Sequence, residues 1–259
     1  MNLNVFGTNP GRVRDLVGTF GRVQVISPPQ SLDDYLVLEN LQCFDAEGRI
    51  TESYPQVFVR KSVEKEGGKI LVRTPSDCVA YCSEHGLILP SFALTFAIVQ
   101  RLFESKSDPA CLEVLMQYKN KGDGNGWHTT NTIVNWKNRR IIHYPRELGH
   151  STLSQVEHSF EVKDFGNFKL SQALKNNQFR NYLINLTGLR TPESLLELGN
   201  LFKKSVMAWV PNNPKEANYT SGAWFGCNVN YLYLDCFDVL TDNDGFRGVR
   251  FGAAGDTKI

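Results

Sequence analysis

Hydrophobic and polar positions in the first part of the chain alternate over short distances, as they do in β-strands. Such runs lie at 35–44, 57–63 and 69–74, and turn-forming Pro, Gly and Asp residues separate them. We therefore expect residues 1–73 to be rich in strands.

From Thr74 onward the apolar residues recur at the spacing of helices. Thr74 and Ser91 are each placed to cap the start of a helix, and Gly86 is placed to end the first one. Asp108 precedes a proline that opens a third, shorter helix, which we expect to reach Met116. The middle of the chain is thus predicted to be helical.

Strands return after the helices. Residues 127–136 and 139–145 are predicted to form a hairpin, and 205–211 another strand. Residues 146–203 are polar and irregular except for one expected helix near 192–202, and we interpret them as an insertion. Strands, then capped helices, then strands again indicate a single α+β domain rather than a doubly wound parallel sheet.

The segment WFGCNVNYLYLDCFDV, residues 224–239, breaks the strand pattern. Between Tyr231 and Asp235, leucines alternate with tyrosines and an acid, so a strand there would bury Leu232 and Leu234. Outside that window the alternation fails, and the segment has no Lys, Arg, Glu or Gln. Tyr, Asn, Asp and Phe are typical of binding surfaces, because rigid aromatic rings give contact area and small polar groups adapt their hydrogen bonds. An irregular edge strand is the alternative.

Composition excludes several classes of protein. The chain has 259 residues, of which 41% are hydrophobic and 21% charged, as in a globular protein with a sizeable core. Its formal charge is +1 and no basic stripe stands out, so we do not expect nucleic acid as a partner. No apolar run approaches the length of a membrane-spanning helix, and we expect no membrane insertion.

The start of the sequence has no apolar stretch of the kind found in secretory signals. We therefore expect the protein in the cytoplasm, or associated with a virion or a cell surface by a non-classical route. The six cysteines are too few for a disulfide scaffold in a chain of this length, and we expect them to be mostly reduced.

Cys78, Cys82 and His85 lie on one predicted helix at a spacing that could hold part of a zinc site. No second pair of ligands matches them, and free cysteines are commonly buried, so we expect these two cysteines to belong to the core.

Three further groups of residues could suggest a functional site, and we interpret each of them as structural. Four histidines lack any metal-binding or catalytic spacing, namely His128, His143, His150 and His158. Three glycines do not follow an apolar strand as phosphate loops do, namely Gly122, Gly124 and Gly126. Four tryptophans are expected to anchor the core, namely Trp127, Trp136, Trp209 and Trp224. We predict no catalytic residue, metal or cofactor.

Two motifs resemble one fold. DCVAYCSEHGLILPS, residues 77–91, resembles the A-x-x-Y-C-x-x-x-G-x-x-L-P-[ST] joint between two helices of C-type-lectin folds of the formylglycine-generating-enzyme type. SGAWF followed by DNDGFRGVRF, within residues 221–251, resembles the C-terminal G-G-S-W…D…GFR signature of the same fold. The resemblance implies two helices packed on short antiparallel sheets, with residues 1–73 as a β-rich extension and 146–203 as an insertion.

Two activities share this signature. The oxidase branch uses two cysteines with four residues between them, whereas eight residues separate Cys227 from Cys236 here. The other branch is the variable proteins of diversity-generating retroelements, in which an error-prone reverse transcriptase rewrites Asn codons. Those codons never become Lys, Glu, Gln, Met or Trp, and residues 225–246 contain none of these five types.

The second resemblance implies a ligand-binding protein, not an enzyme, whose variable region lies within 221–251. Its partner would be a protein or another cell-surface ligand, and its oligomeric state stays open. A formylglycine-type oxidase and a phage or viral structural protein are the alternatives.

The resemblance also implies two layers of residues in the variable region. A scaffold layer would fix the backbone and consists of Trp224, Leu232, Leu234, Phe246 and Arg247. A ligand-facing layer would consist of Phe225, Cys227, Asn228, Asn230, Tyr231, Tyr233, Asp235, Cys236 and Asp238.

Overall fold

The fold combines helices and antiparallel strands. A computed structural model describes residues 31–119, 127–149, 153–162, 167–209, 220–236, 240 and 244–251. In chain order, its strands are β1 (Tyr35–Phe44), β2 (Ile50–Arg60), β3 (Lys65–Glu66), β4 (Lys69–Ile70), β5 (Trp127–Asn135), β6 (Arg140–His143), β7 (Val156–Ser159), β8 (Asn167–Lys169), β9 (Ser205–Trp209), β10 (Thr220–Cys227), β11 (Tyr231–Asp235) and β12 (Val249–Phe251). Its helices are α2 (Pro75–Glu84), α3 (Phe92–Glu104), α4 (Pro109–Lys119), α5 (Leu170–Ala173), α6 (Asn177–Thr187) and α7 (Ser194–Phe202). The predicted α+β class is confirmed.

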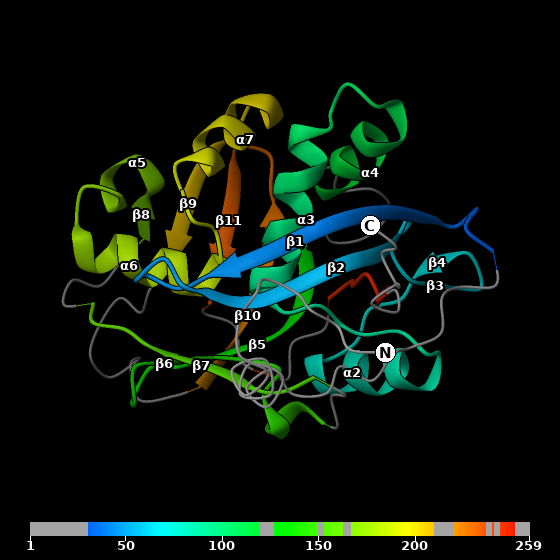
Figure 1. The fold of residues 1–259 in the computed structure, drawn as a ribbon, viewed down its shortest axis with the longest axis horizontal. Helices are drawn as coiled ribbons and strands as arrows, with labels where there is room; N and C mark the ends of the chain where they lie inside the picture. Colours follow the sequence, from blue (N-terminus) through cyan, green and yellow to red (C-terminus); the bar gives the residue numbers. More distant parts are fainter. Residues whose placement is uncertain are drawn as a thin grey trace, which may run out of the picture.

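Two sheets enclose α3. Within the described residues, the larger sheet has the order β7-β6-β5-β10-β11-β9-β8, and the smaller one has the order β1-β2-β12. All neighbours in the larger sheet are antiparallel except β11 and β9, which run parallel. Helix α3 contacts β1 of the smaller sheet as well as β5 and β10 of the larger one. Figure 1 shows β1 and β2 passing in front of α3, so the helix forms a central layer.

Local capping signals explain where the central helices begin. Thr74 Oγ1 accepts a hydrogen bond from the Asp77 backbone N–H at 3.3 Å, and Ser91 Oγ accepts one from the Leu94 N–H at 3.0 Å. Both predicted helix starts are confirmed. Helix α4 begins at the predicted proline and continues to Lys119, beyond the expected end.

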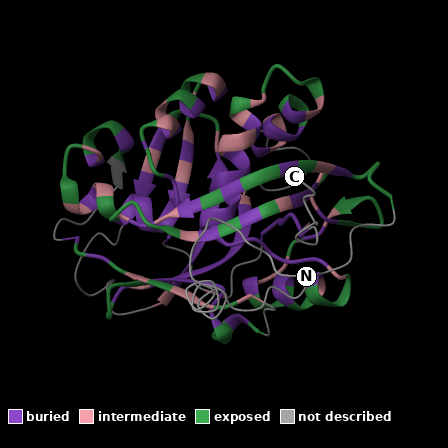
Figure 2. Ribbon diagram, in the orientation of Figure 1, coloured by how far each residue is buried: buried purple, intermediate pink, exposed green. Residues whose placement is uncertain are grey.

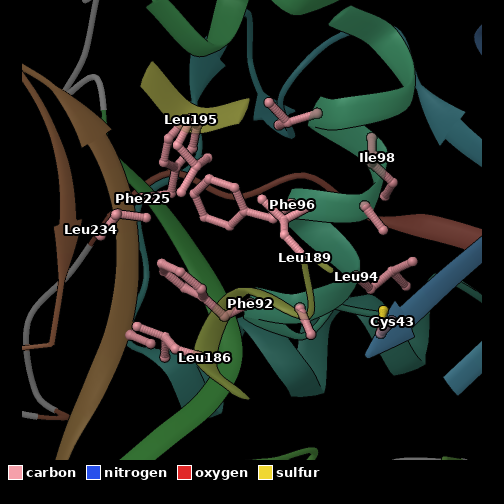
Figure 3. Close-up of a cluster of buried hydrophobic side chains, with 14 of the residues drawn as sticks. Cys43, Phe92, Leu94, Phe96, Ile98, Leu186, Leu189, Leu195, Phe225 and Leu234 are labelled. Atoms are coloured by element: carbon pink, nitrogen blue, oxygen red, sulfur yellow. The ribbon is translucent and has the colours of Figure 1, made fainter. Parts of the chain in front are cut away.

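The core is centred on the aromatic face of α3. The Phe92 and Phe96 rings lie 4.9 Å apart, and Phe96 meets Phe225 of β10 edge-on at 4.8 Å between ring centroids. Figure 3 shows these three rings gathered with Leu186 and Leu195, which come from α6 and α7. Figure 2 shows buried residues concentrated where α3 meets the strands. Three layers therefore share one continuous core.

Residues 146–203 are more ordered than the sequence pattern predicted. They include α6, whose buried residues Phe179, Tyr182 and Leu183 face the core beside α3. They also contribute β7 and β8, the two outer strands of the larger sheet. The prediction of irregular structure is wrong over α6, because its apolar residues have helical spacing although Asn, Arg and Gln separate them. The predicted helix near 192–202 is confirmed as α7.

The N-terminal strands also differ in their limits. The strand expected at 57–63 begins earlier, at Ile50, because β2 pairs along the whole of β1. The strand expected at 69–74 is reduced to β4 and an isolated bridge between Arg73 and Asp244. Residues 1–30 lie outside the described part of the chain.

No helix in the described ranges is both long and apolar enough to cross a membrane.

Leu183→Ala should lower the free energy of unfolding by about 2–5 kcal/mol, because it removes a buried side chain from the contact between α6 and α3. Asn181→Ala on the exposed side of the same helix is the matched control, with a change within about 0.5 kcal/mol. Urea denaturation of both variants measures the difference. Equal effects would show that α6 is not part of the core.

Candidate functional site

The segment that breaks the strand pattern is a hairpin. Strand β10 ends at Cys227, the chain reverses over Asn228–Asn230, and β11 begins at Tyr231. The two strands pair antiparallel, with Trp224 opposite Asp235. The alternation fails outside β11 because the chain turns and because β10 is buried along almost its whole length. Alternation requires a strand with one face in the core and one in solvent. Of the two strands of the hairpin, β11 meets this condition and β10 does not.

Side chains hold the hairpin turn in one shape. Asn228 Oδ1 accepts hydrogen bonds from the backbone N–H groups of Asn230 at 2.9 Å and of Tyr231 at 2.8 Å. Lys204, after α7, donates from Nζ to the carbonyl oxygens of Asn228 and Val229. An asparagine side chain thus provides the turn that a glycine would otherwise favour.

Two glycines allow β10 to pack against tryptophan rings. A Cβ atom at Gly226 would lie 2.3 Å from the Trp127 ring, and one at Gly222 would lie 2.2 Å from the Trp224 ring. Both distances are far inside van der Waals contact, so any larger residue would displace a ring. The inner strand of the hairpin is therefore fixed by steric fit.

Strand β11 and the start of β5 carry half-buried aromatic residues. Trp127 and Tyr233 stack with ring centroids 5.6 Å apart and planes inclined by 29°, and the rings of Tyr231 and Tyr233 lie 5.7 Å apart. All three side chains are partly exposed. We call Trp127, Tyr231 and Tyr233 the aromatic strip. Their contacts with one another leave them few rotamers to lose on binding a partner.

A shallow hollow of about 460 Å³ lies beside the turn. It is lined by Gly199, Asn200, Lys203, Lys204, Ser205, Asn230 and Tyr231. The hollow joins the end of α7 and the start of β9 to the hairpin, so its walls come from parts of the chain that are distant in sequence.

Five predicted ligand-facing residues are at least partly exposed, namely Asn228, Asn230, Tyr231, Tyr233 and Asp235. The predicted exposure of three others is wrong: Phe225, Cys227 and Cys236 are buried, at 0%, 1% and 0% exposure. Phe225 packs between α3 and α4, with its ring 5.8 Å from that of Tyr118. Asp238 lies outside the described residues.

The predicted scaffold residues are all buried, which confirms their assignment to the interior: Trp224, Leu232, Leu234, Phe246 and Arg247. Arg247 contacts two elements, because its guanidinium donates to the Arg60 carbonyl of β2 and to Gln117 Oε1 of α4 and lies 5.1 Å from the Tyr118 ring centroid. Burial lowers the pKa of Arg247. These contacts fasten the C-terminal segment to β2 and α4.

Three of the four tryptophans have described side chains, and they divide into two kinds; the side chain of Trp209 lies outside the described part of the structure. Trp136 and Trp224 are buried, as predicted, whereas Trp127 is only partly buried and belongs to the surface. Trp127 and the lysines of the hollow were missed as site residues. Nothing in the local sequence signals their proximity to the turn, which arises from strand pairing and from the position of α7.

The cysteines are packed as apolar side chains. All six are buried, and none of them forms a disulfide. Cys78 and Cys82 lie in the core, whereas His85 is exposed, and no group of three metal-binding side chains occurs in the described part of the chain. Burial raises the pKa of the Cys227 thiol to about 12, opposed by nearby lysines. A protonated thiol is a weak nucleophile and a weak metal ligand.

Two of the histidines, His128 and His143, are buried. Burial lowers the pKa of both His128 and His143 to about 3, with smaller contributions from Arg247 and His158 respectively. His143 makes hydrogen bonds through both ring nitrogens, to Thr132 Oγ1 at 2.8 Å and to the Asn185 carbonyl at 3.1 Å. These fixed contacts are expected of a neutral buried imidazole. His150 and the three glycines between residues 120 and 126 lie outside the described ranges.

Glu52 of β2 is the most unusual buried acid. It is 7% exposed, and its Oε2 accepts a hydrogen bond from the Tyr54 hydroxyl, which lies 3.0 Å from the Tyr144 hydroxyl. Among the described residues, Glu52 Oε1 has no hydrogen-bond partner. Burial raises the pKa of Glu52 to about 7, partly offset by the hydrogen bond from Tyr54. The group is enclosed by the core, so we interpret it as structural.

Comparisons of the chain with protein-family models, curated proteins and solved structures found no match. The α+β class therefore rests on the structure alone.

Glu52 should make stability depend on pH. Because its folded pKa, about 7, lies above the ordinary value of 4.5, the unfolded chain releases this proton first as pH rises. The contribution of protonated Glu52 is fully present below about pH 4.5 and is lost as pH rises through 7. Urea denaturation at several pH values in this range measures the free energy of unfolding of the wild type and of Glu52→Gln. The variant should become increasingly stable relative to the wild type as pH rises. The histidines are the same in both proteins, so their effect cancels in the comparison. A difference in the free energy of unfolding that stays constant with pH would contradict the raised pKa of Glu52.

Proposed function

We propose that this chain is a ligand-binding protein. Its binding surface would be the face of the β10–β11 hairpin that carries the partly exposed Tyr231, Tyr233 and Asp235. The observation that carries the proposal is the division of the hairpin into a buried strand and a partly exposed one. The partner would be a protein or another cell-surface ligand.

The proposed fold is C-type-lectin-like. Two features of the chain support it. Helices α2 and α3 are joined by the buried residues 87–90 and contact antiparallel strands, as the first sequence motif implies. Phe246 and Arg247 of the second motif are buried against neighbouring elements. Both motifs therefore have a packing role in keeping with the resemblance.

The structure would tolerate substitution of the exposed side chains of β11. Leu232 and Leu234 of β11 are in the core, whereas Tyr231, Tyr233 and Asp235 are partly exposed. Exposed substitutions usually change the free energy of unfolding by less than about 0.5 kcal/mol. The backbone of β11 is meanwhile held by pairing with β10 on one side and β9 on the other. Side chains facing solvent could change without loss of the scaffold.

We further propose that a retroelement reverse transcriptase diversifies this surface. The residue types in 225–246 agree with rewritten Asn codons, as the sequence indicates. The positions available for ligand contact are Asn228, Asn230, Tyr231, Tyr233 and Asp235. Asn228 is the most constrained of the five, because its side chain accepts two backbone hydrogen bonds in the turn.

A formylglycine-type oxidase is less well supported. That activity needs a reactive pair of cysteines, whereas Cys227 and Cys236 are both buried and burial raises the pKa of Cys227 to about 12. A viral structural protein with the same fold would be expected to keep residues 225–240 invariant, so sequence variation separates it from a diversified receptor.

Tyr231→Ser and Tyr233→Ser should each cost about 1 kcal/mol or less, because these side chains are partly exposed. Both lose aromatic contacts, and Tyr233 also loses the hydrogen bond that its hydroxyl accepts from Asn228 Nδ2 at 3.3 Å. Leu234→Ala, the matched control on the same strand, should cost about 2–5 kcal/mol, since Leu234 is 1% exposed. Thermal denaturation compares the three. Loss of folding in Tyr233→Ser would count against a surface that tolerates diversification.

Sequencing the gene in related lineages tests the diversification itself. We expect a neighbouring reverse-transcriptase gene and an imperfect copy of the segment that differs only where the copy has adenine. Variation should fall on Asn230, Tyr231, Tyr233 and Asp235 and should spare Trp224, because only the former are partly exposed. An invariant segment across lineages would contradict the proposal.

A further inference from the structure

Lysine side chains border the aromatic strip on one side. Lys203 and Lys204 follow α7 and line the hollow together with Asn230 and Tyr231. None of the described residues that line this hollow is an aspartate or a glutamate. The hollow is therefore locally positive in a chain whose formal charge is only +1.

A third lysine approaches the hairpin from the other side. Lys119 ends α4, which packs against β10, and its neighbour Tyr118 contacts Phe225. Burial raises the pKa of Cys227, and the charges of Lys204 and Lys119 both oppose that rise. The two lysines therefore act on the same end of β10, where the hairpin turn begins.

The backbone at Lys203 is unusual. Its φ is +56°, in the left-handed region where glycine is preferred at helix ends, yet the position holds an exposed lysine. A residue with a Cβ atom costs about 1–2 kcal/mol in this conformation. The helix C-cap that this conformation forms offsets the cost, because the Lys203 N–H donates to the Asn200 carbonyl at 3.1 Å and the Lys204 N–H donates to the Gly199 carbonyl at 2.9 Å. The cap holds both lysines at the hollow.

Helix dipoles explain only part of this arrangement. Lys119 lies in the last turn of α4, where a positive charge is favourable on its own. Helix α7 has no basic residue in its last turn, and Lys204 lies beyond the helix, bonded to carbonyl groups of the hairpin turn. The charge of Lys204 is thus directed to the turn.

We propose that the hairpin surface binds an acidic polypeptide segment, with a carboxylate in the hollow at Lys203 and an adjacent aromatic or apolar side chain on the aromatic strip. This inference rests on the proposed function and gives its ligand a chemical class. Carboxylates form charge-assisted hydrogen bonds with ammonium groups, and opposite charges also speed the encounter.

A polypeptide fits better than single-stranded nucleic acid. Nucleic-acid grooves follow the phosphate chain with a continuous row of basic residues and offer separate aromatic faces to successive bases. Here Lys204 is already bonded to two carbonyl groups, and Trp127 and Tyr233 stack on each other. The surface therefore offers a few charges beside one continuous aromatic patch.

Selection from a random peptide library displayed on phage tests the inference. Enriched peptides should combine Asp or Glu with an aromatic residue, and a synthetic copy should bind about tenfold or more weakly to the Lys119→Glu/Lys203→Glu variant. Binding should also weaken as salt is raised, because the charges lie near the surface. The control is Lys65→Glu/Lys69→Glu, which changes the net charge equally at the exposed β3–β4 hairpin and should not alter affinity.

The other outcomes separate the inference from the proposed function. Peptides without acidic enrichment that lose binding on Tyr231→Ser/Tyr233→Ser would overturn the acidic class and leave the binding surface standing. Peptides that ignore both the tyrosine and the lysine variants would contradict the surface itself. A fluorescent oligothymidylate that binds more tightly than the acidic peptide, through the same lysines, would assign the surface to nucleic acid. Circular dichroism of every variant confirms folding.

Discussion

Strand β10 is buried on both faces, and the rest of the candidate site depends on how it fits. On one face, the absence of side chains at Gly222 and Gly226 makes room for the rings of Trp224 and Trp127. On the other face, Phe225 packs against Phe96 of α3. A strand packed this closely has little freedom to shift, because interiors have the density of molecular crystals. Its position fixes where the turn and β11 lie.

Because of this constraint, the residues that stabilise the hairpin differ from those that face solvent. The core side chains of the hairpin belong to the same cluster as α3, so the scaffold does not rely on residues that face solvent. The turn is held by the Asn228 side chain and by Lys204, which also brings positive charge to the hollow. One lysine thereby orders the surface and gives it an electrostatic preference. The aromatic strip adds area with few rotamers to lose.

Structural features that depend on residues close together in the sequence could be predicted. Helix starts at Thr74 and Ser91 depend on a capping side chain and its neighbours, and the β5–β6 hairpin depends on adjacent strands. The alternation within β11 correctly identified its buried leucines. These signals act over a few residues, so one sequence is enough to recognise them.

Features set by distant packing could not be predicted. Phe225 and Cys227 have the residue types of a binding surface, and only the cover provided by α3 and α4 shows that they are buried. The turn at Asn228 has no glycine, because a side-chain oxygen accepts the backbone hydrogen bonds instead. Lys203 reaches the hairpin through the pairing of β9 with β11, a contact between separate parts of the chain. The site is assembled by tertiary structure.

The division of the hairpin is tested most directly by scanning every substitution across residues 220–236 and measuring the amount of folded protein displayed on a cell surface. The account predicts tolerance at Asn230, Tyr231, Tyr233 and Asp235, and near-complete intolerance at Gly226 and the other buried positions. Equal sensitivity of the two sets, or free substitution at Gly226, would contradict it.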